Sequence, residues 1–171
     1  ESVNTILFYD IISDDDTTLT TILEIPLWLQ EVPAEPNTPP VLSAVSINGE
    51  ALAVTGGTIS VERLADIEFG VVVDATSLQS FVDNVGRDRE EEAFVSFFST
   101  KGRFDVERRV GVDVSNTLSF YAENMEGERE LLLPPEGLTA ADSEVTLYAV
   151  VRDGRGGQAV AGPYVVDLAG N

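Results

Sequence analysis

Residues 143–166 alternate between apolar and polar side chains in a way that constrains the fold of the whole chain. From Val145 to Val151, apolar residues occupy every second position, which is the period of a β-strand with one face toward a core. The glycine-rich run at residues 153–157 follows, and apolar residues then return through Ala159, Tyr164 and Val166. The sequence therefore predicts an antiparallel hairpin near the end of an all-β domain.

The chain between this hairpin and residue 41 carries further strand patterns separated by turn residues. The clearest covers residues 67–75, where apolar positions again alternate with polar or small ones. Strands are also expected at residues 41–47, 93–100, 103–114, 118–122 and 128–133. Short strands at such spacing are typical of an immunoglobulin-like antiparallel β-sandwich, which is the fold that we expect.

One short helix is expected at residues 78–85. The apolar residues of this segment recur at helical spacing, so they would share one face. Ser77 is a suitable N-cap, and Gly86 stands where a left-handed residue commonly ends a helix. Such a helix would connect two strands at one end of the sandwich.

A proline-rich segment, residues 33–40, divides the chain into two parts. Its four prolines cannot donate hydrogen bonds to a sheet and favour an extended backbone. We therefore expect an N-terminal β-hairpin extension at residues 1–32, a linker at residues 33–40 and the sandwich at residues 41–171.

The N-terminal part contains two strand-like segments, residues 4–13 and 19–30, joined through an acidic turn. Two strands alone are marginally stable in water, so a larger surface must cover their apolar side chains. That surface is either the chain's own sandwich or a neighbouring subunit or domain that accepts the strands. The residues that we expect to make this contact are Ile6, Phe8, Ile11, Ile25, Leu27 and Trp28.

The composition excludes several classes of partner and chemistry. The chain has 30 acidic and 10 basic residues and a formal net charge of −20, so nucleic acid and anionic membranes would repel it. No apolar run is long enough for a membrane-spanning helix, so membrane insertion is not expected. Cysteine and histidine are absent, which removes thiolate sites, the usual general base and the usual metal ligand. We therefore expect no enzyme activity, catalytic residues or cofactor.

Two acidic clusters and one aspartate deserve comparison with metal sites. Asp14, Asp15 and Asp16 are consecutive and lack the spaced D-x-D-x-D-G pattern of a calcium loop, so a solvated turn is the better interpretation. Residues 90–92 are three glutamates that we expect to form an exposed loop before a strand. Asp153 is expected to cap its own turn. Calcium binding is the alternative at Asp14, Asp15 and Asp16, and cation binding is the alternative at Asp153.

Several motifs of residues 37–171 resemble a known family. They are N-T-P-P-V-L at residues 37–42, S-F-F-S-T-K-G-R-F at 96–104, T-L-Y-A-V-V-R-D-G-R-G-G at 146–157 and V-V-D-L-A-G-N at 165–171. This part of the chain resembles bacterial immunoglobulin-like domains of the polycystic-kidney-disease and cadherin-like kind. The resemblance implies a spacer, adhesion module or assembly part of a surface or secreted protein.

These observations together favour a non-catalytic module that is extracellular or lies on the cell surface. We expect it to take part in a protein assembly through its N-terminal strands, by self-association or by contact with a neighbouring subunit or domain. We expect the protein to be exported, with its targeting segment already removed from this sequence. The alternative is a glycan- or calcium-binding accessory module of a larger secreted protein.

Overall fold

The computed structural model describes residues 2–12, 18–28, 37–83, 85–134 and 136–169. Its internal contacts divide the chain into two units, Glu1–Asn37 and Thr38–Asn171. The first unit contains β1 (Ser2–Ile12) and β2 (Thr18–Trp28), which pair antiparallel. The register runs from Ser2 opposite Trp28 to Ile12 opposite Thr18. The first unit is therefore a regular two-stranded hairpin.

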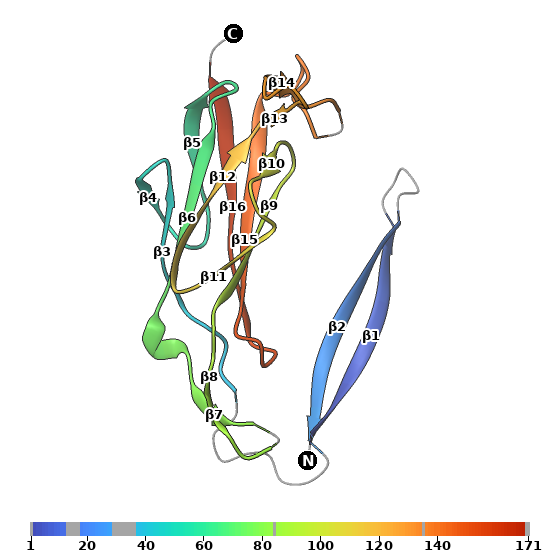
Figure 1. Ribbon diagram of the computed structural model, residues 1–171, viewed down its shortest axis with the longest axis vertical. Helices are drawn as coiled ribbons and strands as arrows, with labels where there is room; N and C mark the ends of the chain where they lie inside the picture. The colour runs from blue at the N-terminus through green and yellow to red at the C-terminus, as the bar shows by residue number, and fades with distance from the viewer. Residues whose placement is uncertain (1, 13–17, 29–36, 84, 135, 170–171) are drawn as a thin grey trace. The chain divides into compact units, whose positions relative to one another are not determined.

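The second unit contains two five-stranded sheets, shown in Figure 1. The first has the strand order β10-β12-β6-β3-β4 and the second the order β11-β9-β15-β16-β5. The strands of the first sheet are β3 (Leu42–Ile47), β4 (Glu50–Leu52), β6 (Ile67–Val73), β10 (Arg103–Phe104) and β12 (Asp113–Ser119). Those of the second are β5 (Gly57–Glu62), β9 (Phe94–Ser99), β11 (Arg108–Val110), β15 (Glu144–Arg152) and β16 (Gln158–Ala169).

Three small elements lie outside these sheets. β7 (Ser80–Val82) pairs with β8 (Asp88–Glu90), and β13 (Tyr121–Glu123) pairs with β14 (Arg129–Leu131). A 3-10 turn, η1 (Ala75–Ser77), follows β6. In Figure 1 the β7–β8 pair lies at one end of the sandwich and the β13–β14 pair at the opposite end.

The prediction of an all-β sandwich is confirmed. All strand pairs in the described residues are antiparallel except β5 with β16, which are parallel. The order β3-β6-β12-β10 in one sheet and β9-β15-β16 in the other is the A-B-E-D and C-F-G order of an immunoglobulin sandwich. Chain connectivity and sheet order therefore agree with the fold class expected from the sequence.

The core lies between the inner faces of the two sheets and follows from the period of two. β6 and β15 each bury every second residue, including all four apolar positions from Val145 to Val151. Aromatic rings fill the centre, because the ring centroid of Phe69 lies 5.6 Å from that of Phe97 and 5.5 Å from that of Tyr164. Of the two phenylalanines on the central strand β9, Phe97 points inward and Phe98 is exposed.

The prediction of a helix at residues 78–85 is wrong. Residues 80–82 form β7 instead, and the carboxylate of Asp83 accepts hydrogen bonds from the backbone N–H groups of Val85 and Arg87. Gly86 does have a positive φ of 81°, but it serves the turn between β7 and β8 rather than a helix end. The apolar pattern is misleading because Val85 is exposed and has no core to face.

Two strands of the structure, β4 and β5, have no counterpart among the predicted strands, and some predicted strands are divided. Residues 103–114 were expected as one strand, yet they contribute to β10, β11 and the start of β12. Gly111, with a φ of 137°, breaks the extended backbone between β11 and β12. β5 is a parallel edge strand, and its pairing with distant β16 leaves no signal in the local sequence.

Candidate interaction surfaces

The six residues expected to bind a partner all lie on the two strands of the hairpin. Ile6, Phe8 and Ile11 are on β1, opposite Glu24, Ile22 and Leu19 respectively. Ile25, Leu27 and Trp28 are on β2, opposite Thr5, Val3 and Ser2. The structure thus places these residues in one small sheet, although no two of them are direct partners, and their side chains lie outside what it describes.

The edges of this hairpin are the first candidate surface. No third strand pairs with β1 or β2 within the described residues, so each strand has one edge without a sheet partner. The edge of a sheet presents backbone N–H and C=O groups that another strand can bind. This geometry suits addition of a strand from a neighbouring molecule or domain.

The acidic residues considered as metal ligands form no such site in the described part of the chain. No group of three or more carboxylates there could hold a metal ion, and Asp14, Asp15 and Asp16 lie outside it. Asp153 is buried, and its Oδ1 accepts hydrogen bonds from the backbone N–H groups of Arg155 (2.7 Å) and Gly157 (3.0 Å). The expectation that Asp153 caps its own turn is confirmed.

One of the three glutamates at residues 90–92 differs from the expectation of an exposed loop. The side chain of Glu91 is fully buried, and its Oε1 lies 2.8 Å from the guanidinium of Arg155. Its Oε2 accepts a hydrogen bond from the backbone N–H of Gln79. Glu91 therefore joins the β7–β8 region to the β15–β16 turn, whereas Glu90 and Glu92 are exposed.

Three other carboxylates with a lowered pKa accept hydrogen bonds from groups in their own turns. The backbone N–H of Arg87 lowers the pKa of Asp83, and that of Thr139 lowers the pKa of Asp142. The hydroxyl of Thr76 lowers the pKa of Asp74, which caps η1. Because hydrogen bonds to the charged form account for these shifts, they indicate structural roles rather than acid–base chemistry.

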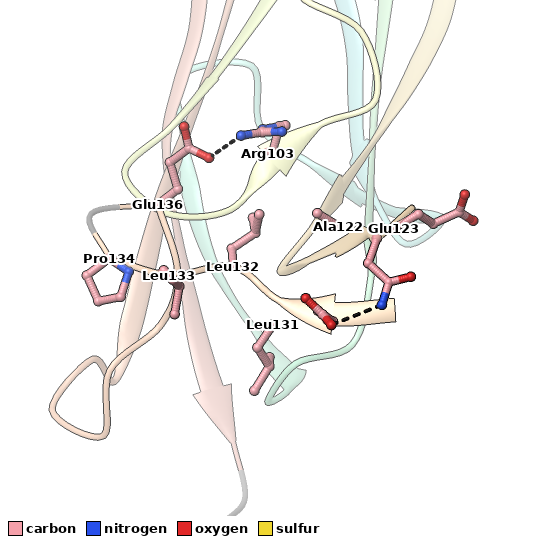
Figure 2. A pocket seen from close by; sticks show the side chains of 10 residues that line it. Arg103, Ala122, Glu123, Leu131, Leu132, Leu133, Pro134 and Glu136 are labelled. Atoms are coloured by element: carbon pink, nitrogen blue, oxygen red, sulfur yellow. Dashed lines mark hydrogen bonds and ion pairs between the residues drawn. The ribbon is translucent and has the colours of Figure 1, made fainter. Parts of the chain in front are cut away.

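A shallow pocket of about 410 Å³ lies beside the β13–β14 pair (Figure 2). The ion pair between Arg103 and Glu136, 2.7 Å long, closes one side of it. The remaining lining residues are Ala122, Glu123, Asn124, Glu130, Leu131, Leu132, Leu133 and Pro134. Glu130 accepts a hydrogen bond from Asn124, and the lining offers no nucleophile next to a general base.

A second pocket of about 450 Å³ lies along the edge between β9 and β10. Its lining residues are Ser96, Phe97, Phe98, Ser99, Arg103, Phe104, Val106 and Glu107. Phe98 and Ser96 also belong to the outward face of the second sheet, so this pocket opens beside that face. No hydrogen bond joins Ser96 or Ser99 of this lining to its carboxylate, Glu107.

The outward face of the second sheet is the second candidate surface, which we call the outer face. It comprises the outward positions of β9, β11, β15 and β16, and four of its large apolar residues are exposed. They are Phe98 (49% exposed), Val110 (55%), Tyr148 (37%) and Val160 (53%). Tyr148 pairs directly with Phe98 across β15 and β9, so their side chains are neighbours on the sheet. A contiguous apolar area on a sheet face is a mark of an interaction surface.

Charged residues lie at the two ends of the outer face. Arg152 is directly opposite Phe94, and the guanidinium of Arg108 lies 5.3 Å from the centre of the same ring. At the opposite end, Glu144 is directly opposite Asp167. Neither these arginines nor these two carboxylates form an ion pair with any residue that the structure describes.

The comparisons with known proteins leave the family open. No protein-family model, curated protein or solved structure matches this chain. The described residues contain no helix that is long and apolar enough to cross a membrane.

Sequence reasoning did not identify the outer face. The signal was present, because Tyr148 and Val150 are bulky residues at positions of β15 that alternate with the core. In the apolar–polar alternation of β15, Tyr148 and Val150 take the place of polar residues, so the alternation alone does not reveal that these two side chains are large and apolar. Aromatic residues at outward positions of two paired strands are the pattern that could have revealed this surface.

Proposed function

We propose that this chain is a non-catalytic structural or adhesion module of an extracellular or cell-surface protein, of the bacterial immunoglobulin-like kind. In this proposal its N-terminal hairpin binds a neighbouring subunit or domain. The sandwich is the folded body of the module in this proposal. The strand order of the body supports the likeness to immunoglobulin-like domains.

The observation that carries this proposal is the hairpin itself. β1 and β2 form eleven residue pairs with each other and none with a third strand among the described residues. A two-stranded sheet of this kind is not independently stable in water. Pairing with a further strand, or covering of one face, would supply the missing stability.

The chemistry of the body supports a role other than catalysis. The chain has no histidine or cysteine, and the two pockets on the body have linings without a nucleophile–base pair. Its buried carboxylates among the described residues, Glu91 and Asp153, are engaged with Arg155 and with a turn. These features suit a load-carrying or adhesive module.

The proposal is tested with the full chain and two matched triple variants. The first replaces Ile6, Phe8 and Ile11 with lysine, and the control replaces Ser2, Thr18 and Thr20 with lysine. Sedimentation velocity over a range of concentrations measures the assembly state. The first variant should assemble at least about tenfold more weakly than the original chain, because it removes apolar contact area, and the control should change little.

Two results would contradict the hairpin-mediated contact. One is equal sedimentation of the original chain and both variants at every concentration. The other is loss of the cooperative unfolding transition of the body in the first variant, which would make the hairpin part of the same core.

A further inference from the structure

The outward side chains of β15 would be complementary to those of a second β15 that runs in the opposite direction. From one end to the other they are Glu144, Thr146, Tyr148, Val150 and Arg152, and the aromatic residue stands at the centre. If a second copy of this strand lies across it in the opposite direction, Tyr148 meets Tyr148. Each Glu144 then faces the Arg152 of the other copy, and each Thr146 faces a Val150.

The neighbouring strands extend this pattern. The outward positions of β9 are Phe94, Ser96 and Phe98, and Phe98 is directly opposite Tyr148, so Phe98 would meet Phe98 of a reversed second copy. On the other side, β16 contributes exposed Val160, which pairs directly with Val150. The middle of the outer face is therefore apolar across three adjacent strands, and the charges lie at its ends.

The charges at these ends lack partners that a second copy would supply. Glu144 and Asp167 are directly opposite each other on adjacent strands, an arrangement of like charges that destabilises a sheet. Arg152 and Arg108 both approach Phe94 at the far end and form no ion pair with the described residues. A reversed second copy brings Arg152 of each molecule to Glu144 of the other, because both residues lie on β15. Arg108 on β11 and Asp167 on β16 lie on strands that are not adjacent, and this axis does not bring them together.

We propose that the outer face binds a second copy of this chain in an antiparallel two-fold stack. The two-fold axis lies between the faces and perpendicular to β15, so that the same surface is used on both molecules. Sheets that pack face to face in this way interdigitate their side chains about 10 Å apart. This contact goes beyond the hairpin-mediated contact proposed above and does not depend on it.

The size of the face fits a reversible dimer. Four strands about 4.8 Å apart and the nine residues of β15 at about 3.3 Å each give an area on the order of 600 Å² per molecule. About 1,200 Å² in total is at the lower end of specific protein interfaces. Each chain also has a formal net charge of −20, and mutual repulsion opposes association. We therefore expect a dimer with a dissociation constant in the micromolar range at about 0.15 M salt.

Charge-reversal variants of the full chain test the stack. Arg152→Glu places two carboxylates opposite each other, and Glu144→Arg places two arginines opposite each other. Each variant should raise the dissociation constant by at least about tenfold. The double variant Arg152→Glu, Glu144→Arg exchanges the charges and should restore the constant to within about threefold of the original. Sedimentation equilibrium provides these constants.

Net charge alone predicts a different outcome, which makes the test selective. Arg152→Glu makes the chain more negative and Glu144→Arg makes it less negative, so repulsion between whole molecules would weaken one dimer and strengthen the other. The control Glu126→Arg makes the same change of charge in an exposed turn away from the outer face. It should not weaken the dimer.

An apolar variant supplies an independent readout. Tyr148→Asp places a charge at the centre of the stack and should abolish dimer formation, whereas Leu133→Asp, at an exposed position outside the outer face, should not. Circular dichroism and thermal unfolding establish that each variant is folded. Combining Tyr148→Asp with the triple-lysine hairpin variant separates the two contacts. Tyr148→Asp alone should remove only the stack, the triple-lysine variant alone should remove only the hairpin-mediated contact, and the combination should remove both.

Two outcomes would overturn the stack. One is a dimer that persists when Tyr148→Asp is combined with the triple-lysine hairpin variant, and the other is a double charge-reversal variant that stays as weak as the single variants. If Tyr148→Asp and the hairpin variant instead remove one and the same association, the outer face receives the hairpin of another molecule and the stack is wrong.

Discussion

Two ion pairs of nearly equal length occupy very different surroundings in the sandwich. Arg155 lies 2.8 Å from Glu91, and their side chains are 25% and 0% exposed. Arg103 lies 2.7 Å from Glu136, and their side chains are 62% and 49% exposed. Solvent screens the second pair, whereas the first holds a carboxylate that has no access to water.

Truncating the two arginines should therefore have unequal effects. Arg155→Ala leaves Glu91 buried without its cation and removes the guanidinium from the ring of Phe81, 4.6 Å away. We expect a loss of about 2 kcal/mol of unfolding free energy for Arg155→Ala and less than about 0.5 kcal/mol for Arg103→Ala. Urea denaturation of both variants measures this difference, and equal losses would contradict the structural role of Glu91.

The buried hydroxyl of Tyr164 makes the stability of the fold depend on pH in the alkaline range. Its hydroxyl donates hydrogen bonds to the carbonyl oxygens of Ala53 and Val54, each 2.9 Å away, and burial raises its pKa from 10.0 to about 12. A folded-state pKa above the unfolded value means that this contribution is complete below pH 10 and is lost as the pH rises through 12.

The variant Tyr164→Phe isolates this contribution. At pH 7 it should lower the free energy of unfolding by about 1 kcal/mol, because each carbonyl keeps one backbone donor, Gly56 or Gly162. Between pH 10 and 12 the original chain should lose stability more steeply than the variant. Denaturation curves at a series of pH values provide the comparison, and parallel curves above pH 10 would exclude the proposed cause.

For single residues, a hydrogen bond between close neighbours in the sequence can be predicted from the sequence, whereas the burial of a side chain by a distant residue cannot. The carboxylate of Asp153 binds backbone groups two and four residues away, so the sequence of the turn is enough to predict this cap. The burial of Glu91 depends on Arg155, which is 64 residues distant. Nothing in the neighbouring glutamates distinguishes Glu91 before the strands are assembled.

At the scale of elements, β5 shows how a single glycine permits a strand to join a sheet. Gly56 has a φ of 119°, and a Cβ at this position would collide with the carbonyl oxygen of Pro163 on β16. β5 begins at the next residue and pairs with β16 from Tyr164 onward. The absence of a side chain at residue 56 lets the two backbones come together.

Replacing this glycine should displace β5. Gly56→Ala should cost more than about 2 kcal/mol of unfolding free energy, because a steric collision adds to the backbone strain. Gly127→Ala is the control, since Gly127 also has a positive φ but its added Cβ would meet open space, and about 1 kcal/mol is expected there. Thermal unfolding compares the two variants, and a Gly56→Ala variant as stable as the control would argue against close packing at this point.

The elements that the sequence predicted well are those with a buried face. β6 and β15 follow their alternation because each packs against the core along its length. In the segment at residues 78–85, Leu78 packs against the core but Val82 and Val85 are exposed, so its apolar spacing did not decide between helix and hairpin. The hydrogen bonds of Asp83 to the turn stabilise the hairpin instead.

At the scale of the whole molecule, the chain divides into two units. The sandwich buries a single core between two sheets, whereas the hairpin belongs to a different unit of the chain. The sequence predicted both the sandwich and the hairpin from strand periodicity. It could not predict the outer face, because that surface arises only when β9, β15 and β16 lie side by side.

The central claim is that another molecule completes the hairpin. Hydrogen–deuterium exchange of the full chain, at concentrations below and above the onset of assembly, tests it most directly. We predict that the amides of β1 and β2 exchange within about a minute in the dilute chain and become protected on assembly, while β15 is protected throughout. Hairpin amides that are as protected as β15 in the dilute monomer would contradict the account.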